Sequence, residues 1–295
     1  MDSIHVIHEW FGLGKPGHSL ITLFNYEDIR RKVSFAGKTL VNSLYYIALK
    51  KIPEGAYIQY GRQAYDFQEG SMMFMAPGQT FHTERDEEDA IGWALVFHPD
   101  LIRHGNLGLK INDYTFFSYA VHEALHLSEK EKQSVGRIVE TIQAEYNANL
   151  DNHSHTLIIS NLELLLNYCD RFYSRQFITR EAVNHDVISQ FERYLKEYFD
   201  SDKPMERGVP SVKQCARAMN YSPNYLSDLL RKETGRGTLE HIHSFLIERA
   251  KTLLLASNDS VNEIARRLGF EYPNHFSRLF KKQTGETPAS YRRVS

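Results

Sequence analysis

Two segments near the C-terminus space hydrogen-bonding side chains three or four residues apart, which places them along one face of a helix. Asparagine, serine, aspartate and arginine are among the side chains that hydrogen-bond base edges in the major groove of DNA. A solvated polar face would be the simpler interpretation for one helix, but the second segment repeats the first and both end in basic residues. The set expected to face DNA is Asn224, Tyr225, Ser227, Asp228, Arg231 and Lys232 in the first segment, and Asn274, His275, Ser277, Arg278, Lys281 and Lys282 in the second.

The elements that must position these side chains form an internal repeat. Residues 211–235 and 260–285 match at an offset of 49 positions before the turn and 50 after it. Each copy has the pattern of a helix-turn-helix: serine begins a short helix, Asn220 or Gly269 ends it with positive φ, proline opens the second helix and Thr-Gly closes it. Residues 238–256 predict a linker helix about 28 Å long at ~1.5 Å per residue. That length suits the ~34 Å between successive major-groove faces.

Three runs in the second copy carry a resemblance to a known family: ARxLGFE at Ala265–Glu271, HFSRLFKKxTG at His275–Gly285, and TPxxYR from Thr287 to Arg292. With them, residues 187–295 resemble the DNA-binding domain of the AraC/XylS family of bacterial transcription regulators. The resemblance implies two helix-turn-helix units that bind double-stranded DNA. It places base contacts at Asn224, Ser227 and Asp228, and at Asn274, Ser277 and Arg278.

The first copy departs from the family pattern, and the charge distribution supports the C-terminal location of the DNA contacts. Asn220 replaces the usual turn glycine, and Asp228 is acidic where a long polar or basic residue is frequent. Residues 201–295 hold 16 Lys and Arg against 10 Asp and Glu, a balance of +6, whereas residues 1–200 have a balance of −8. A basic domain fits a nucleic-acid partner. The side chains expected to contact phosphates are Lys232, Lys281, Lys282, Arg292 and Arg293.

The N-terminal part has a different pattern, because short aromatic and β-branched runs punctuated by glycine occupy residues 40–100. Such runs are typical of a sandwich or small barrel. This part also resembles the family's common sensor half, so the predicted fold class is α+β. We expect a cupin-like β-barrel with following helices over 1–183 (strands about 20–100, helices about 112–175) and an all-α double helix-turn-helix domain over 184–295. Residues 176–186 lack periodicity and are expected to form the junction.

Two helices are predicted after the strands. Ser128 and Glu131 form a capping box that opens the first. The second, from about 154 to 175, is apolar around most of its circumference and must be buried on several sides. Either it lies centrally in its own domain, or part of it meets another subunit, in which case residues 128–175 would form a homodimer.

Aromatic side chains in the predicted strands could line a pocket for a small-molecule effector, since ligand sites favour aromatic-lined barrel mouths. The candidates are Tyr46, Tyr57, Tyr60, Tyr65, His82 and Trp93. A barrel core with surface tyrosines explains each of them at least as well. No metal or cofactor is expected, because residues 54–69 contain none of the histidines of the first cupin signature.

The run from His122 to His126 is a literal HExxH. On a helix this spacing holds zinc between two histidines, with the glutamate as general base. Ser128 predicts a new helix only two residues later, so the required helix could not continue. We therefore expect surface or interface histidines and no enzyme.

Composition sets the remaining bounds. Apolar residues make up 42% and charged residues 24%, as in ordinary globular proteins. The two cysteines exclude a disulfide framework, and no apolar run reaches the ~18–20 residues of a membrane helix. A cytoplasmic protein is expected. Three functions stay open: a ligand-sensing regulator that contacts RNA polymerase if it activates, a DNA-binding protein whose N-terminal half only dimerises, and a cupin or zinc enzyme fused to a DNA-binding tail.

Overall fold

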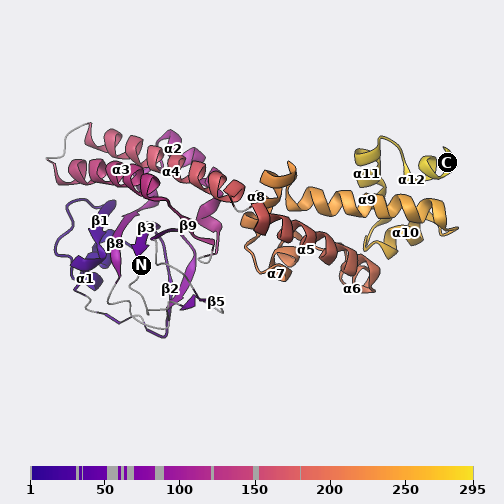
Figure 1. Cartoon of the computed structure of the whole chain (residues 1–295), viewed down its shortest axis with the longest axis horizontal. Helices are drawn as coiled ribbons and strands as arrows, with labels where there is room; N and C mark the ends of the chain where they lie inside the picture. Colours follow the sequence, from indigo (N-terminus) through magenta and orange to yellow (C-terminus); the bar gives the residue numbers. More distant parts are fainter. Residues whose placement is uncertain are drawn as a thin grey trace. The chain divides into compact units, whose positions relative to one another are not determined.

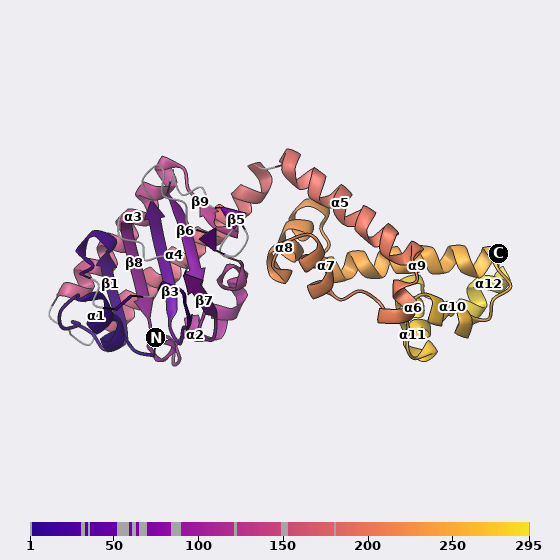
Figure 2. The same cartoon turned by 90° about the horizontal axis from the view of Figure 1, so that it is seen from below.

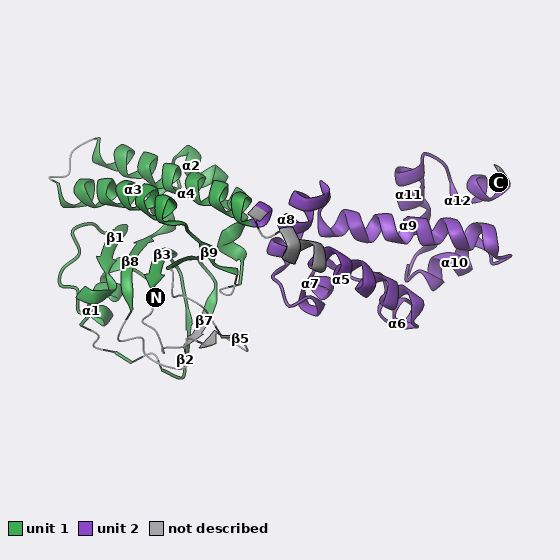
Figure 3. Cartoon of the chain, viewed as in Figure 1, with its two compact units in different colours: residues 1–176 green, residues 177–295 purple. Residues whose placement is uncertain are grey.

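The chain folds into two compact units in the computed structural model, Met1–Gln176 and Phe177–Ser295 (Figure 3). Figures 1 and 2 show a sheet with flanking helices in the first unit and helices alone in the second. The structure describes residues 2–30, 33–34, 36–51, 59–60, 63–64, 70–83, 90–120, 123–148, 153–179 and 181–294. The fold is therefore mixed α+β, as predicted.

The first unit is built around an antiparallel five-stranded sheet in the order β1-β8-β3-β6-β9. Its strands are β1 (Ile21–Asn25), β3 (Tyr45–Lys51), β6 (Ser71–Met75), β8 (Ile91–Phe97) and β9 (Leu125–His126). The pairs β2 (Lys38–Val41) with β7 (Thr80–Thr83), and β4 (Gln59–Tyr60) with β5 (Gln63–Ala64), form separate two-stranded sheets. Among the strands that are described, β1 and β9 are edges that do not pair with each other, so the predicted barrel is not closed.

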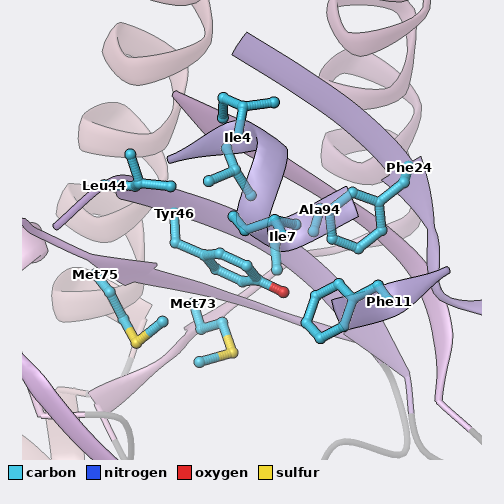
Figure 4. Close-up of a cluster of buried hydrophobic side chains, with 11 residues drawn as sticks. Ile4, Ile7, Phe11, Phe24, Leu44, Tyr46, Met73, Met75 and Ala94 are labelled. Atoms are coloured by element: carbon cyan, nitrogen blue, oxygen red, sulfur yellow. The ribbon is translucent and has the colours of Figure 1, made fainter. Parts of the chain in front are cut away.

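A helix that the sequence analysis did not predict, α1 (Ile4–Phe11), covers one face of this sheet. Its N-cap is Ser3, whose hydroxyl accepts a hydrogen bond from the Val6 amide at 3.3 Å. Ile4, Ile7 and Phe11 lie on one side of the helix and pack with strand residues such as Phe24, Tyr46 and Ala94 (Figure 4). The i, i+3, i+7 spacing of these three side chains was the available signal.

The other face of the sheet packs against the helical half of the unit. Its helices are α2 (Asn106–Lys110), α3 (Glu129–Asn147) and α4 (Ser154–Thr179), with 3₁₀ turns at Tyr26–Asp28, Pro99–Leu101, Ile111–Asp113 and Thr115–Ser118. The predicted capping box of Ser128 and Glu131 is confirmed. Buried Cys169 of α4 contacts Met72 of β6 at 3.9 Å, which fixes α4 against the sheet.

The end of this half differs in detail from the expected boundaries, and the division between the two units, after Gln176, falls at the start of the expected junction 176–186. Helix α4 extends to Thr179, beyond the predicted end near 175, and α5 begins at Glu181. The stretch 176–186 is therefore mostly helical, although its sequence lacks a regular apolar stripe. Burial of Gln176 explains part of the mismatch: its amide is held inside by the His126 amide at 2.8 Å and the Ala124 carbonyl at 3.2 Å, so a polar residue occupies a core position.

The second unit contains eight described helices, which realise the predicted repeat. They are α5 (Glu181–Asp200), α6 (Lys203–Arg207), α7 (Val212–Ala218), α8 (Pro223–Thr234), α9 (Thr238–Ala256), α10 (Val261–Arg267), α11 (Pro273–Thr284) and α12 (Pro288–Val294). Ser211 and Ser260 cap α7 and α10 through capping boxes, and proline stands at the start of α8 and α11. The predicted linker helix 238–256 is α9.

Both helix-turn-helix turns need a residue with positive φ, and the two copies use different residues for it. Asn220 has φ 61° and Gly269 has φ 93°, in the left-handed region that costs residues with a Cβ about 1–2 kcal/mol, asparagine least. A Cβ on Gly269 would also lie 2.7 Å from the Gly208 carbonyl carbon and 2.9 Å from the Pro204 oxygen. The second turn therefore packs directly against the backbone that follows α6.

We expect Gly269→Ala to lower the free energy of unfolding of the second unit by at least about 2 kcal/mol, because strain in φ adds to a backbone clash. Gly285→Ala is the matched control: φ is 87°, but a Cβ there meets nothing within 4 Å, so about 1 kcal/mol is expected. Urea unfolding of both variants measures the difference. Equal losses would contradict the close packing at Gly269.

Candidate nucleic-acid interface

The second copy presents a polar ridge on α11. Phe276 and Phe280 are fully buried and attach the helix to its unit. On the opposite side Asn274, Arg278 and Lys281 are exposed, and in the part of the chain that is described their side chains make no hydrogen bond or ion pair. The spacing i, i+4, i+7 sets them along one line. This arrangement leaves an amide and two cations available to a ligand.

The remaining α11 candidates lie beside this ridge. His275 is exposed, and the centroid of its ring lies 5.5 Å from that of Tyr272. Lys282 is exposed near the end of the helix. Ser277 is half-buried. The nearby Lys282 contributes to lowering the pKa of His243, although burial of that histidine is the larger cause. The C-terminal end of α11 is therefore strongly basic.

The first copy has the same layout on α8, but its polar side chains are already engaged. The Ser227 hydroxyl accepts a hydrogen bond from the Thr238 amide at 3.2 Å, at the start of α9. Asp228 forms an ion pair with Arg231 at 3.1 Å, and the Asp228 side chain is only 19% exposed. Asn224 and Lys232 remain exposed. The ridge of α8 consequently offers fewer free groups than that of α11.

Tyr225 does not lie on this ridge. It is 6% exposed, its ring stacks on Tyr221 with centroids 5.2 Å apart, and it meets Phe177 edge-on at 5.2 Å. We therefore withdraw Tyr225 from the candidate surface and assign it to the core. The i, i+4 spacing of Tyr221 and Tyr225 was the sequence signal for this packing.

Arg292 is likewise engaged. Its guanidinium donates to the Leu254 carbonyl at 3.0 Å and to the Asp259 carbonyl at 2.7 Å. It therefore ties α12 to the C-terminal end of α9, where a cation also compensates the helix dipole. We remove Arg292 from the expected phosphate contacts, whereas Arg293 is exposed.

Both recognition helices are fixed to the linker helix α9. Thr234, the last residue of α8, contacts His241 of α9 through an oxygen–nitrogen distance of 2.7 Å. At the other end, Phe280 of α11 packs on Tyr291, whose neighbour Arg292 binds the end of α9. Since α9 has 19 residues, it is about 28 Å long. A helix fixed at both ends is a stiff spacer between the two ridges.

The structure describes the side chains of only two of the six aromatic pocket candidates in the first unit, Tyr46 and Trp93. Tyr46 is buried in the core beside α1, and its hydroxyl lies 2.7 Å from that of Tyr26. Trp93 is half-buried on β8. Only the backbone is described for Tyr60 in β4 and His82 in β7, and Tyr57 and Tyr65 lie outside the described residues.

The HExxH segment does not form the helix that a zinc protease needs. Leu125 and His126 form strand β9, and the His126 ring nitrogen Nδ1 lies 3.1 Å from the Ser71 hydroxyl. Buried Glu123 accepts a hydrogen bond from the Ala120 amide at 2.6 Å. His122 lies outside the described residues. Within the described ranges no three His, Cys, Asp or Glu side chains are grouped so as to hold a metal.

Comparison with known proteins finds relatives that share the C-terminal part of the chain. Residues 215–294 match a family described as helix-turn-helix domain. The chain is 27% identical over 187 residues to the uncharacterized HTH-type transcriptional regulator YijO of Escherichia coli (strain K12), covering 63% of this chain and 62% of that protein. It is 38% identical over 112 residues to the uncharacterized transcriptional regulatory protein YesN of Bacillus subtilis (strain 168), covering 36% and 28%. The chain thus spans about three fifths or less of the length of these curated relatives.

A solved structure, the DNA-binding domain of AdpA in complex with a target DNA, is 25% identical and covers 38% of this chain and 90% of that chain, with a TM-score of 0.31. The matched segment, residues 215–294, contains most of the first repeat copy and all of the second. The C-terminal segment is an AraC-type helix-turn-helix domain, and the proteins that share it are transcriptional regulators. Along the described residues, no helix is both long and apolar enough to cross a membrane.

Proposed function

We propose that this chain regulates transcription by binding double-stranded DNA through its two helix-turn-helix units, with α11 as the main reading helix. The exposed side chains of Asn274, Arg278 and Lys281 carry the proposal, because they make no hydrogen bond or ion pair with any described residue. An amide and two cations can bind a ligand that offers donors, acceptors and negative charge, as DNA does. The engaged Ser227 and Asp228 of α8 favour a weaker, positioning role for the first unit. The exposed cations Lys232, Lys281, Lys282 and Arg293 contribute contacts to phosphates.

Arg278→Ala tests this assignment. Arginine pairs bidentately with guanine O6 and N7, so the variant is expected to lose about 1–3 kcal/mol of specific binding, roughly 5- to 150-fold, and to relax preference at one position. Arg193→Ala on α5 is the matched control, since it removes one exposed arginine outside both helix-turn-helix units. Fluorescence anisotropy on a selected site measures both. Equal losses in the two variants would reduce Arg278 to a general positive charge.

We also propose that the N-terminal unit is a cupin-like sensor and dimerisation module controlled by a small-molecule effector in the cytoplasm, with an RNA polymerase contact if the protein activates. Helix α4 supports the dimer. Leu157 and Leu164 are 44% and 45% exposed although most apolar residues of this helix are buried. They are seven positions apart in the sequence, which places both on one side of the helix as in a helix–helix seam.

The paired variant Leu157→Glu, Leu164→Glu is expected to shift the protein from dimer to monomer, because two carboxylates in a symmetric seam repel each other and lose apolar burial. Arg171→Glu on an exposed position of the same helix controls for a change of charge. Light scattering at several concentrations gives the mass. A wild-type monomer, or an unchanged dimer in the double variant, would exclude this seam.

A further inference from the structure

The N-terminal unit has a groove of about 680 Å³ that DNA binding does not use. It lies between the end of α1 with its following loop, β1 with its following turn, and the last turns of α3, which lie at the same end of the unit in Figures 1 and 2. Small-molecule sites usually have volumes of ~300–1,000 Å³. Neither Tyr46 nor Trp93, the two pocket candidates whose side chains are described, is among its lining residues.

The loop that forms one wall of the groove is held at both ends. Buried His8 lies 3.1 Å from the Gly14 carbonyl through Nδ1 and 2.7 Å from the Thr22 hydroxyl through Nε2. Since a carbonyl only accepts, Nδ1 carries the proton and Nε2 accepts from Thr22. At the other end, the Gly17 amide donates to the Tyr146 hydroxyl of α3 at 2.8 Å. The loop is therefore shaped before any ligand arrives.

Two donors on this loop and on α3, Lys15 and Tyr146, have no acceptor among the described residues. Lys15 stands between the two fixed points, is exposed, and makes no hydrogen bond or ion pair with any described residue. The Tyr146 oxygen accepts from Gly17, which leaves its own O–H proton without an acceptor among the described groups. An ammonium and a hydroxyl that both lack an acceptor favour an anionic oxygen group, because charge-assisted hydrogen bonds are the strong ones.

The rest of the lining is polar and mixed in character. The Asn25 amide donates to Asp28 at 3.3 Å, and the Gln143 amide donates to Asn147 at 3.3 Å. These bonds leave carbonyl and carboxylate oxygens as acceptors and the Asn147 amide as a donor. Such an edge suits hydroxyl or amino groups. Phe24, at the edge of the core in Figure 4, contributes an apolar base.

We propose that this groove binds a small carboxylate that also carries hydroxyl or amino groups, with its carboxylate held by Lys15 and Tyr146. The assignment of this compound as the effector rests on the proposed regulatory function, whereas its binding does not. With this proposal, the expected effector site lies at the surface between α1 and α3 and not among the aromatic residues of the strands.

The test uses the full chain and a panel of sugar acids, hydroxy acids and amino acids. Each is paired with the compound in which the carboxylate is replaced by CH₂OH. Ligand-observed NMR finds binders, and calorimetry measures affinity for wild type, Lys15→Gln and the control Lys130→Gln, an exposed lysine at the far end of α3. We expect at least one carboxylate to bind, its CH₂OH partner not to bind, and Lys15→Gln alone to weaken binding at least tenfold.

Three results would overturn the proposal: no carboxylate binds, the CH₂OH partner binds equally well, or Lys15→Gln leaves the affinity unchanged. DNA affinity is then measured with and without the bound carboxylate. Binding through Lys15 without a change in DNA affinity keeps the groove assignment and removes its role as effector site. If the Arg278 experiment contradicts DNA reading by α11, the proposal that the groove binds a carboxylate still stands on its own binding data.

Discussion

Inserting five base pairs between the two segments of one binding site should cost the C-terminal unit, residues 177–295, at least about thirtyfold in affinity, or about 2 kcal/mol. Five base pairs rotate one segment by about half a turn, since B-form DNA repeats every ~10–10.5 base pairs. Helix α9 is tied to α8 through Thr234 and His241 and to α12 through Arg292. The two ridges therefore cannot follow the rotation, and one unit must leave the groove.

The matched control inserts the same five base pairs outside the site, where affinity should not change. Gel-shift titration with both DNAs gives the two dissociation constants. An unchanged affinity after the internal insertion would mean that α8 makes no useful contact or that α9 bends. Loss in both DNAs would show that the flanking sequence also matters.

Raising the salt concentration should also weaken DNA binding strongly. The exposed cations Lys232, Lys281, Lys282 and Arg293, together with phosphate contacts expected at helix N-termini, account for about four to five phosphates. At ~0.9 per phosphate, log K should fall against log salt with a slope of about −4, which is a loss of affinity of roughly 250-fold between 50 and 200 mM. The sequence alone predicts five cationic side chains at phosphates, but Arg292 binds backbone carbonyls and is not available for such a contact.

Single substitutions check this account. Lys281→Gln should reduce the slope by about one, whereas Lys196→Gln, an exposed lysine on α5, should leave it unchanged. Anisotropy titrations over a salt series measure the slopes. A wild-type slope near zero would argue against phosphate contacts altogether, and equal changes in both variants would mean that only net charge matters.

The elements that local chemistry determines could be predicted, and those that depend on distant partners could not. Ser128, Ser211 and Ser260 begin their helices through side chains three residues away, so their capping boxes are visible in sequence. The open sheet depends on which strands pair across long loops. Helix α1 carries a local signal in the spacing of Ile4, Ile7 and Phe11, but it is only 8 residues long and the surface that this face covers is formed by strands later in the chain.

In the candidate interface, too, local spacing could be read from the sequence, whereas contacts with distant partners could not. Spacing alone identified the ridges of α8 and α11, but it could not distinguish a free side chain from an engaged one. The partner of Ser227 is an amide 11 residues away, and the partners of Arg292 are carbonyls 38 and 33 residues away. Tyr225 was taken for a surface residue because Phe177, its core neighbour, lies 48 positions earlier in the sequence.

Selection of bound sequences from random DNA by the full chain tests the central claim most directly. The enriched sites are expected to contain two segments about 10–10.5 base pairs apart, one strongly and one weakly specified. Repeating the selection with Arg278→Ala should relax the strong segment and leave the weak one as it was. Absence of any enriched site, or an enriched site that Arg278→Ala does not alter, would contradict unequal reading by α11 and α8.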